Sequence, residues 1–180
     1  MLYYIHGYLS SPESTKGLLL KDKLNVKPIK YRDCKPENLD IGECLNCLYD
    51  EIKNDRKVVL IGSSMGGFLA TKTALMHTNV KKLILLNPAI IPPKVDINTI
   101  QGMPKRILID MKDNLLFECK LEAEIFILLG TEDDVIPYYW SIEFAKAQEA
   151  NVKFYHDDHR FSKITYNLPD IIANIIDQKN

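Results

Sequence analysis

The sequence lacks both an excess of basic residues and a long hydrophobic run. Its 23 Lys and Arg residues are balanced by 24 Asp and Glu residues, for a formal net charge of −1, so it has no electrostatic footprint for nucleic acid. No apolar run approaches the roughly 18 residues that a membrane-spanning helix requires, and the first residues enter a strand pattern without a basic leader. We therefore expect a soluble, cytoplasmic protein with no nucleic-acid partner and no membrane span.

Cysteine is also scarce, and the four cysteines do not complete a zinc or redox motif. Cys44 and Cys47 form a C-x-x-C pair, but no second pair accompanies them and no thioredoxin-like strand precedes them. Asp40 and Glu43 resemble a helical capping box, and the apolar positions that follow share one helical face. The sequence therefore predicts that Cys44 is a buried apolar residue in a helix over residues 40–54.

The 180 residues suit one domain with a sizeable core and leave no room for a second. Short apolar runs alternate with helical patterns, which is typical of parallel strands joined by right-handed helical crossovers. We predict an α/β fold with a doubly wound, all-parallel sheet of about six strands. The expected strands are 2–5, 26–31, 58–61, 83–86, 125–129 and 152–155.

Cap signals and prolines refine this outline. Ser11 as N-cap and Pro12 as first residue predict the start of the first helix, whose apolar residues are Leu18, Leu19 and Leu24. Pro28 cannot donate a backbone hydrogen bond, which places the second strand near an edge of the sheet.

Residues 90–122 form a connection that is longer than a parallel crossover needs. Three prolines and one glycine interrupt its apolar runs. We predict a short cap over a site, placed between the fourth and fifth strands.

The most specific motif is G-x-S-x-G over residues 62–66, which lies directly between an apolar strand and a helical pattern. This pattern indicates a nucleophile elbow with Ser64 at its tip. Glycine is required at positions 62 and 66 for a steric reason, because a Cβ at either position would collide with the tightly folded backbone. The predicted inner face of the following helix comprises Met65, Phe68, Leu69, Leu75 and Met76.

A serine hydroxyl needs a base to remove its proton, and the chain has only four histidines. His77 falls near the end of the elbow helix, far from the tip. His156 and His159 both follow the last strand. We favour His159, because a side chain on the loop before the final helix can reach back across the strand ends, and keep His156 as the alternative.

The histidine in turn needs an acid that orients it. The turn after the fifth strand offers Glu132, Asp133 and Asp134. A G-T-x-D turn directs Asp133 inward, so Asp133 is the predicted acid. The alternative is that these carboxylates only cap the helix that begins at Pro137.

Acyl transfer also requires two backbone N–H groups that face the developing oxyanion. Met65 follows the nucleophile at a helix N-terminus and is the first predicted donor. Gly7 allows the loop after the first strand to approach closely, and Tyr8 is the second predicted donor, with Leu9 as the alternative. His6 would then hold this loop through hydrogen bonds rather than act as a base.

A metal or phosphate site is the remaining chemical alternative. His156 and His159 lie three residues apart on a loop, but no distant third ligand is evident. Residues 62–67 lack the Lys-Ser/Thr pair of a phosphate-binding loop. We therefore expect neither a metal nor another cofactor.

These motifs together resemble the α/β-hydrolase superfamily and, more narrowly, the small bacterial YqiA-like esterases, over nearly the whole chain. The matching segments are 4–12, 62–67, 86–89, 130–137 and 158–161. The chain order Ser64, Asp133, His159 is that of the superfamily's serine, acid and histidine. The resemblance implies a reduced α/β-hydrolase fold and hydrolysis of esters or thioesters without a cofactor.

The predicted function is that of a serine esterase for short or medium acyl chains, with a small acyl ester or thioester as its substrate. Aromatic residues are expected to line the mouth of the site: Tyr8, Tyr138, Tyr139, Trp140 and Phe161. An acyl-CoA thioesterase or peptidase on the same triad is one alternative, and a non-catalytic binding module with this fold is another. The sequence leaves the oligomeric state open.

Overall fold

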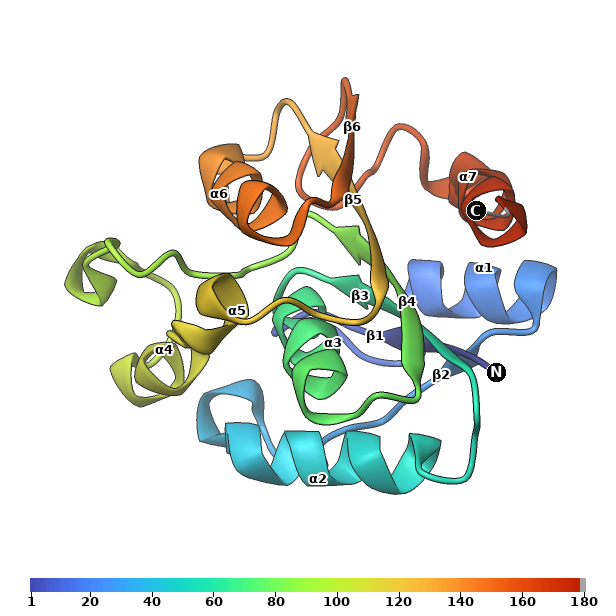
Figure 1. The fold of residues 1–180 in the computed structure, drawn as a ribbon. Coiled ribbons are helices and arrows are strands. Elements are labelled where there is room, and N and C mark those ends of the chain that lie inside the picture. The colour runs from blue at the N-terminus through green and yellow to red at the C-terminus, as the bar shows by residue number, and fades with distance from the viewer. Residues whose placement is uncertain (179–180) are drawn as a thin grey trace.

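The computed structural model describes residues 1–178 and has one sheet of six parallel strands (Figure 1). The strand order is β2-β1-β3-β4-β5-β6, so both the number of strands and their parallel orientation confirm the predicted fold. The strands are β1 (Leu2–Ile5), β2 (Lys27–Pro28), β3 (Val58–Ser63), β4 (Val80–Leu86), β5 (Glu124–Gly130) and β6 (Asn151–Tyr155).

Helices cover both faces of the sheet, because successive strand residues point to opposite sides. Tyr3 and Ile5 pack into the core beneath α2 and α3, whereas Tyr4 packs into the core beneath α1 and α7. No helix within residues 1–178 is long and apolar enough to cross a bilayer. The α-helices are α1 (Thr15–Leu24), α2 (Ile41–Ile52), α3 (Met65–Met76), α4 (Lys105–Met111), α5 (Leu115–Glu118), α6 (Tyr138–Gln148) and α7 (Leu168–Asp177).

The first helix begins later than predicted. Ser11 is not its N-cap, because residues 11–14 form a turn in which Ser14 N–H donates to Ser11 O over 3.1 Å. Ser14 is the N-cap instead, and its hydroxyl accepts from the N–H of Gly17. The buried face of the helix also differs from the predicted one, since Leu20 is buried while Leu18 is 52% exposed. Ser11 and Ser14 have the same intrinsic capping propensity, and the turn between them decides which one caps the helix.

The predicted inner face of α3 was partly wrong. Met65, Phe68 and Leu69 are buried as expected, but Met76 is 53% exposed. Nine of the twelve helix residues are buried, because α3 lies between the sheet and its neighbours α2 and α5. A helix that is covered on most sides has no single apolar stripe from which one face can be predicted.

Two local predictions are confirmed. β2 is the edge strand beyond β1, as Pro28 indicated. Asp40 caps α2 through a 2.9 Å hydrogen bond from Glu43 N–H, and Cys44 is buried in that helix. Burial raises the pKa of the Cys44 thiol to about 12, so this thiol is a neutral, apolar core residue.

Residues 90–122 contain a short 3₁₀ helix (Ile97–Thr99) followed by α4 and α5. Ile107, Leu108 and Leu116 join the core on the α2–α3 side. Arg106 donates a hydrogen bond to Leu39 O over 2.8 Å and so attaches this connection to the residues that precede α2. The connection is therefore an ordered part of the domain, packed against α2, α3 and α6.

Candidate active site

The turn between β3 and α3 holds Ser64 in a strained backbone conformation, with φ 55° and ψ −122°. A residue other than glycine rarely adopts a positive φ, and here the adjoining strand and helix enforce it. The flanking glycines allow the turn to close. A Cβ on Gly62 would lie 2.4 Å from Gly66 O, and one on Gly66 would lie 2.1 Å from Ile5 O. This is the steric reason that the sequence motif predicted.

Gly66→Ala is expected to destabilise the protein by more than about 3 kcal/mol, because the new methyl group would collide with the backbone of β1. Urea unfolding monitored by circular dichroism measures this loss. Gly42→Ala is the matched control, since its added Cβ would lie 3.1 Å from a side-chain oxygen of Asp40 and meets no backbone. Equal unfolding midpoints for the two variants would contradict the steric explanation.

The end of β4 holds Ser64 from the other side. Ser64 N–H donates to Leu86 O over 2.9 Å, and Ser64 O accepts from Ala89 N–H over 3.0 Å. Both backbone groups of the serine are thus fixed by residues that immediately flank Asn87 and Pro88. The side chain is left partly exposed at the carboxyl edge of the sheet.

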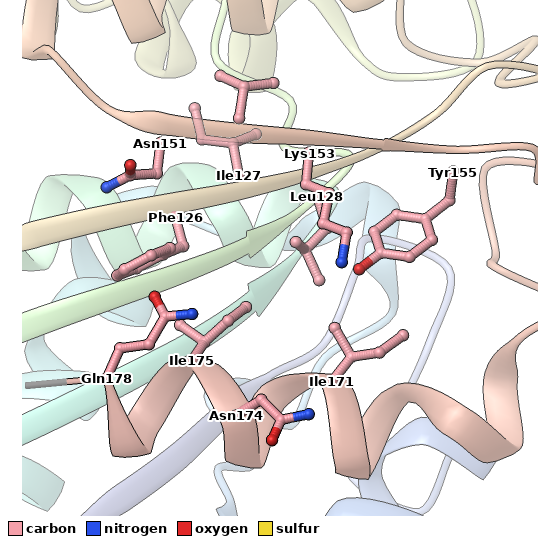
Figure 2. Close-up of a pocket in the computed structure, with 11 residues that line it drawn as sticks. Phe126, Ile127, Leu128, Asn151, Lys153, Tyr155, Ile171, Asn174, Ile175 and Gln178 are labelled. Atoms are coloured by element: carbon pink, nitrogen blue, oxygen red, sulfur yellow. The ribbon is translucent and has the colours of Figure 1, made fainter.

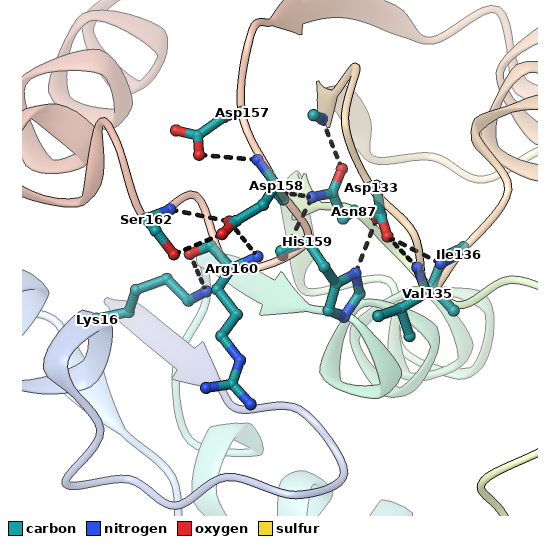
Figure 3. Close-up of polar contacts among 11 residues, drawn as sticks. Lys16, Asn87, Asp133, Val135, Ile136, Asp157, Asp158, His159, Arg160 and Ser162 are labelled. Atoms are coloured by element: carbon teal, nitrogen blue, oxygen red, sulfur yellow. Dashed lines mark hydrogen bonds and ion pairs between the residues drawn. The ribbon is translucent and has the colours of Figure 1, made fainter.

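Asp133 and His159 are brought together by the loops that follow β5 and β6 (Figure 3). Asp133 Oδ2 lies 2.8 Å from His159 Nδ1, and the aspartate side chain is only 3% exposed. Its other oxygen accepts from the N–H groups of Val135 and Ile136 over 2.8 and 2.9 Å. The carboxylate is therefore held at both oxygens, and it fixes one edge of the imidazole.

His156 lies apart from this pair. Its side chain is 80% exposed, and Nε2 lies 3.1 Å from Glu132 Oε1. The two histidines thus have different carboxylate partners, and residues 1–178 contain no cluster of three potential ligands that could hold a metal ion. His77 lies at the end of α3, away from both of these histidines, and stacks on Tyr49.

The loop after β1 approaches Ser64 closely. A Cβ on Gly7 would lie 3.3 Å from Ser64 Cβ and 3.8 Å from its Oγ. Within residues 1–178, the N–H groups of Tyr8, Leu9 and Met65 donate no hydrogen bond in the protein. The amides proposed to bind an oxyanion are therefore free to do so, and one of their loops touches the serine.

His6 and Arg32 hold this loop in place. His6 is 2% exposed, stacks on Tyr31 and forms a 2.9 Å hydrogen bond from Nδ1 to Gly7 O. Burial lowers the pKa of His6 to about 4, so the ring is neutral near pH 7 and can donate from Nδ1. Arg32 donates to Tyr8 O and Ser10 O over 2.9 and 3.0 Å. This role of Arg32 was not predicted, because no local sequence motif signals it.

Ser64, Asp133 and His159 all follow the carboxyl ends of parallel strands, namely β3, β5 and β6, at the edge where open α/β sheets form their sites. Within residues 1–178, the serine hydroxyl has no hydrogen bond to His159. The arrangement supplies a partly exposed serine, an imidazole held by a carboxylate, and backbone amides that donate to no other group of the described residues. These are the groups that nucleophilic acyl transfer needs.

Two of the aromatic residues expected at the mouth are core residues instead. Trp140 is 5% exposed and Phe161 is fully buried, where Phe161 packs edge-on against Tyr155. Tyr138 and Tyr139 are half exposed at the start of α6, close in sequence to the Asp133 loop. Tyr8 is partly exposed. The prediction failed for the first two because large aromatic residues next to strands also fill the core.

A separate cavity of about 250 Å³ lies between β5, β6 and α7 (Figure 2). Phe126, Leu128 and Ile175 form its apolar wall, and Tyr155 borders it at one end. Ser64, Asp133 and His159 do not line it. It opens on the α7 side of the sheet and is distinct from the serine site.

The fold and the elbow together define the α/β-hydrolase class, and solved structures agree. The chain is similar to alpha/beta hydrolase domain-containing protein 10 from mouse, with 18% identity and a TM-score of 0.77 over 98% of this chain and 89% of that one. It is also similar to Est1E from Butyrivibrio proteoclasticus with ferulic acid bound, with 19% identity and a TM-score of 0.73 over 98% of this chain and 89% of that one. At these identities the likeness shows the fold alone.

Within this class, the chain belongs to the uncharacterised protein family UPF0227, whose family model matches residues 1–175. The match spans nearly the whole chain, as did the resemblance to the YqiA-like proteins inferred from the sequence, and it confirms that resemblance.

Proposed function

We propose that this protein is a serine hydrolase that cleaves carboxylic esters with short or medium acyl chains. The observation that carries the proposal is the 2.8 Å hydrogen bond between Asp133 and His159, at the same sheet edge as a strained Ser64. A buried carboxylate that fixes an imidazole, at the sheet edge that also carries a nucleophile elbow, supports this proposal because a serine nucleophile needs such a pair as its base.

In the proposed mechanism, Asp133 accepts a hydrogen bond from His159 Nδ1–H, so that Nε2 carries no proton and acts as the base. His159 removes the proton of Ser64 while the serine oxygen attacks the acyl carbonyl. The N–H groups of Tyr8 and Met65 bind the resulting oxyanion. His159 then protonates the departing alcohol. In the second half of the reaction, His159 takes a proton from a water molecule as its oxygen attacks the acyl group, and returns the proton to the Ser64 oxygen as the carboxylic acid leaves.

The substrate class is argued from the surroundings of the site. Tyr138 and Tyr139 expose apolar rings beside the acid loop, and such rings favour an acyl or aryl group over a charged one. The structure of Est1E has ferulic acid bound, which is an aromatic carboxylic acid. We therefore expect aryl and short acyl esters to be better substrates than acyl-CoA thioesters or peptide amides.

A substrate panel with a covalent probe tests this proposal. Purified protein is assayed with p-nitrophenyl esters of increasing chain length, an acyl-CoA and a peptide amide, and is labelled with a fluorophosphonate. We expect ester hydrolysis that is highest for short or medium chains, and labelling of the wild type but not of Ser64→Ala. Faster hydrolysis of the acyl-CoA or the peptide amide would show that this compound class, and not carboxylic esters, is the substrate. Absence of both hydrolysis and labelling would favour a binding module and overturn the proposal.

A further inference from the structure

Asn87 is a buried polar residue that the proposed mechanism does not use. It follows the last residue of β4 and is 1% exposed. Its φ is 43°, a left-handed conformation that asparagine tolerates better than most residues. A buried amide side chain must satisfy its hydrogen bonds within the protein, so its partners indicate what it holds together.

The partners of Asn87 lie on the two loops that carry the acid and the histidine (Figure 3). Its Oδ1 accepts from Gly130 N–H at the end of β5 over 2.8 Å. Its Nδ2 donates to the backbone carbonyls of Asp158 and His159 over 3.2 and 3.1 Å. One side chain thus connects the strand before Asp133 directly to the residue that supplies the imidazole.

The loop that carries His159 is held together by hydrogen bonds within it. The Asp158 carboxylate accepts from Arg160 N–H and from both Ser162 N–H and Ser162 Oγ, over 2.7 to 3.0 Å. Backbone bonds also tie the acid loop to this loop, since Thr131 N–H donates to Tyr155 O over 2.8 Å. Asp133 and His159 therefore form one unit, and the point where this unit joins the rest of the sheet sets its position.

The unit formed by Asp133 and His159 joins the rest of the sheet at residues 86–89, the same short segment that holds the serine. Leu86 and Ala89, on either side of Asn87, bind both backbone groups of Ser64. The backbone N–H of Asn87 donates to Leu128 O over 3.0 Å and so anchors the segment to β5. Residues 86–89 thus contact all three loops that carry the proposed catalytic side chains.

We propose that Asn87 is a positioning residue, whose side-chain amide fixes the Asp133–His159 pair at the correct distance from Ser64. This inference rests on the proposed function and deepens it. A displacement of about 1 Å between reacting groups costs up to about 100-fold in rate. The amide acts through the backbone of His159 and does not touch the substrate.

Asn87→Asp is the most informative variant. The aspartate has nearly the same shape, tolerates the positive φ and can still accept from Gly130 N–H. It lacks the Nδ2 donor, and places a second oxygen against the carbonyls of Asp158 and His159. The pair is then pushed away from the end of β4 while Ser64 keeps its own backbone bonds.

Asn79→Asp is the matched control. Asn79 Nδ2 also donates to two backbone carbonyls, those of Ile52 and Asp55, each over 3.0 Å. This residue precedes β4, at the end of the sheet opposite Ser64. Both variants lose the same kind of double hydrogen bond, but only one of them lies at the site.

We expect Asn87→Asp to lower kcat for the preferred ester by about 10- to 100-fold with KM changed less than about threefold. Asn79→Asp should leave kcat within about twofold, even though it also loses stability, which urea unfolding measures for both variants. In proton NMR, the His159 Nδ1–H signal, assigned by its loss in His159→Ala, should shift in Asn87→Asp only. Rates are measured where unfolding curves show both variants folded.

Equal kcat values and equal NMR signals for the two variants would overturn the positioning role. If Asn87→Asp does not fold, Asn87→Gly, which suits the positive φ, is compared with Asn79→Gly in the same assays. Failure of the proposed function has a different signature. The wild type would then hydrolyse no ester and take no label, and the NMR comparison alone would decide whether Asn87 positions the imidazole.

Discussion

His159→Ala is expected to lower kcat for the preferred ester by about 10⁵- to 10⁶-fold, the loss seen when serine hydrolases lose their histidine. Without the imidazole, nothing at the site can take the proton of Ser64, and the remaining rate comes from substrate binding and the free amides of Tyr8 and Met65. Steady-state kinetics with a p-nitrophenyl ester measures the loss. Fluorophosphonate labelling should fall in parallel, because it needs the same activated oxygen.

His156→Ala is the control for this experiment. His156 lies three residues before His159, after β6. Its side chain is 80% exposed and pairs with Glu132 rather than with Asp133. Removing an exposed pair of this kind has little effect on stability, and kcat should stay within about twofold. If His156→Ala caused the larger loss, the base would be His156, and the observed Asp133–His159 bond would have only a structural role.

The parallel sheet, and the edge of it where the candidate residues gather, could be predicted because their signals are local. Each buried strand contains a continuous apolar run. The elbow is a five-residue motif whose glycines have a steric cause in the turn and in the strand beside it. Once a sheet is parallel, the residues that follow its strands meet at one edge. The positions of Asp133 and His159 then follow from chain order and need no long-range contact to be guessed.

The features that could not be predicted depend on partners that are distant in sequence. The start of α1 at Ser14 rather than Ser11 is the exception, because a local backbone turn decides it. The burial of α3, in contrast, depends on neighbours on several sides. Asn87 binds a backbone N–H 43 residues away and carbonyls 71 and 72 residues away. Every residue type has these backbone groups, so no pattern in the sequence marks them as partners.

Asp133→Asn is expected to lower kcat by about 10⁴-fold while leaving the fold intact, the size of effect known for this exchange in serine proteases. The asparagine oxygen can still accept from Val135 and Ile136 N–H. Its NH₂ group then faces His159 Nδ1, which must accept instead of donate. The ring proton moves to Nε2, and that nitrogen can no longer take the proton of Ser64.

Asp134→Asn is the matched control, because Asp134 is the adjacent carboxylate and is exposed. Its kcat should remain within about twofold. The unfolding free energies of both variants should lie within about 2 kcal/mol of the wild type, so a large loss of rate in Asp133→Asn cannot come from unfolding. If Asp133→Asn kept most of its activity, this carboxylate would only shape its own turn, as the capping alternative holds. The imidazole of His159 would then need another group to set its tautomer.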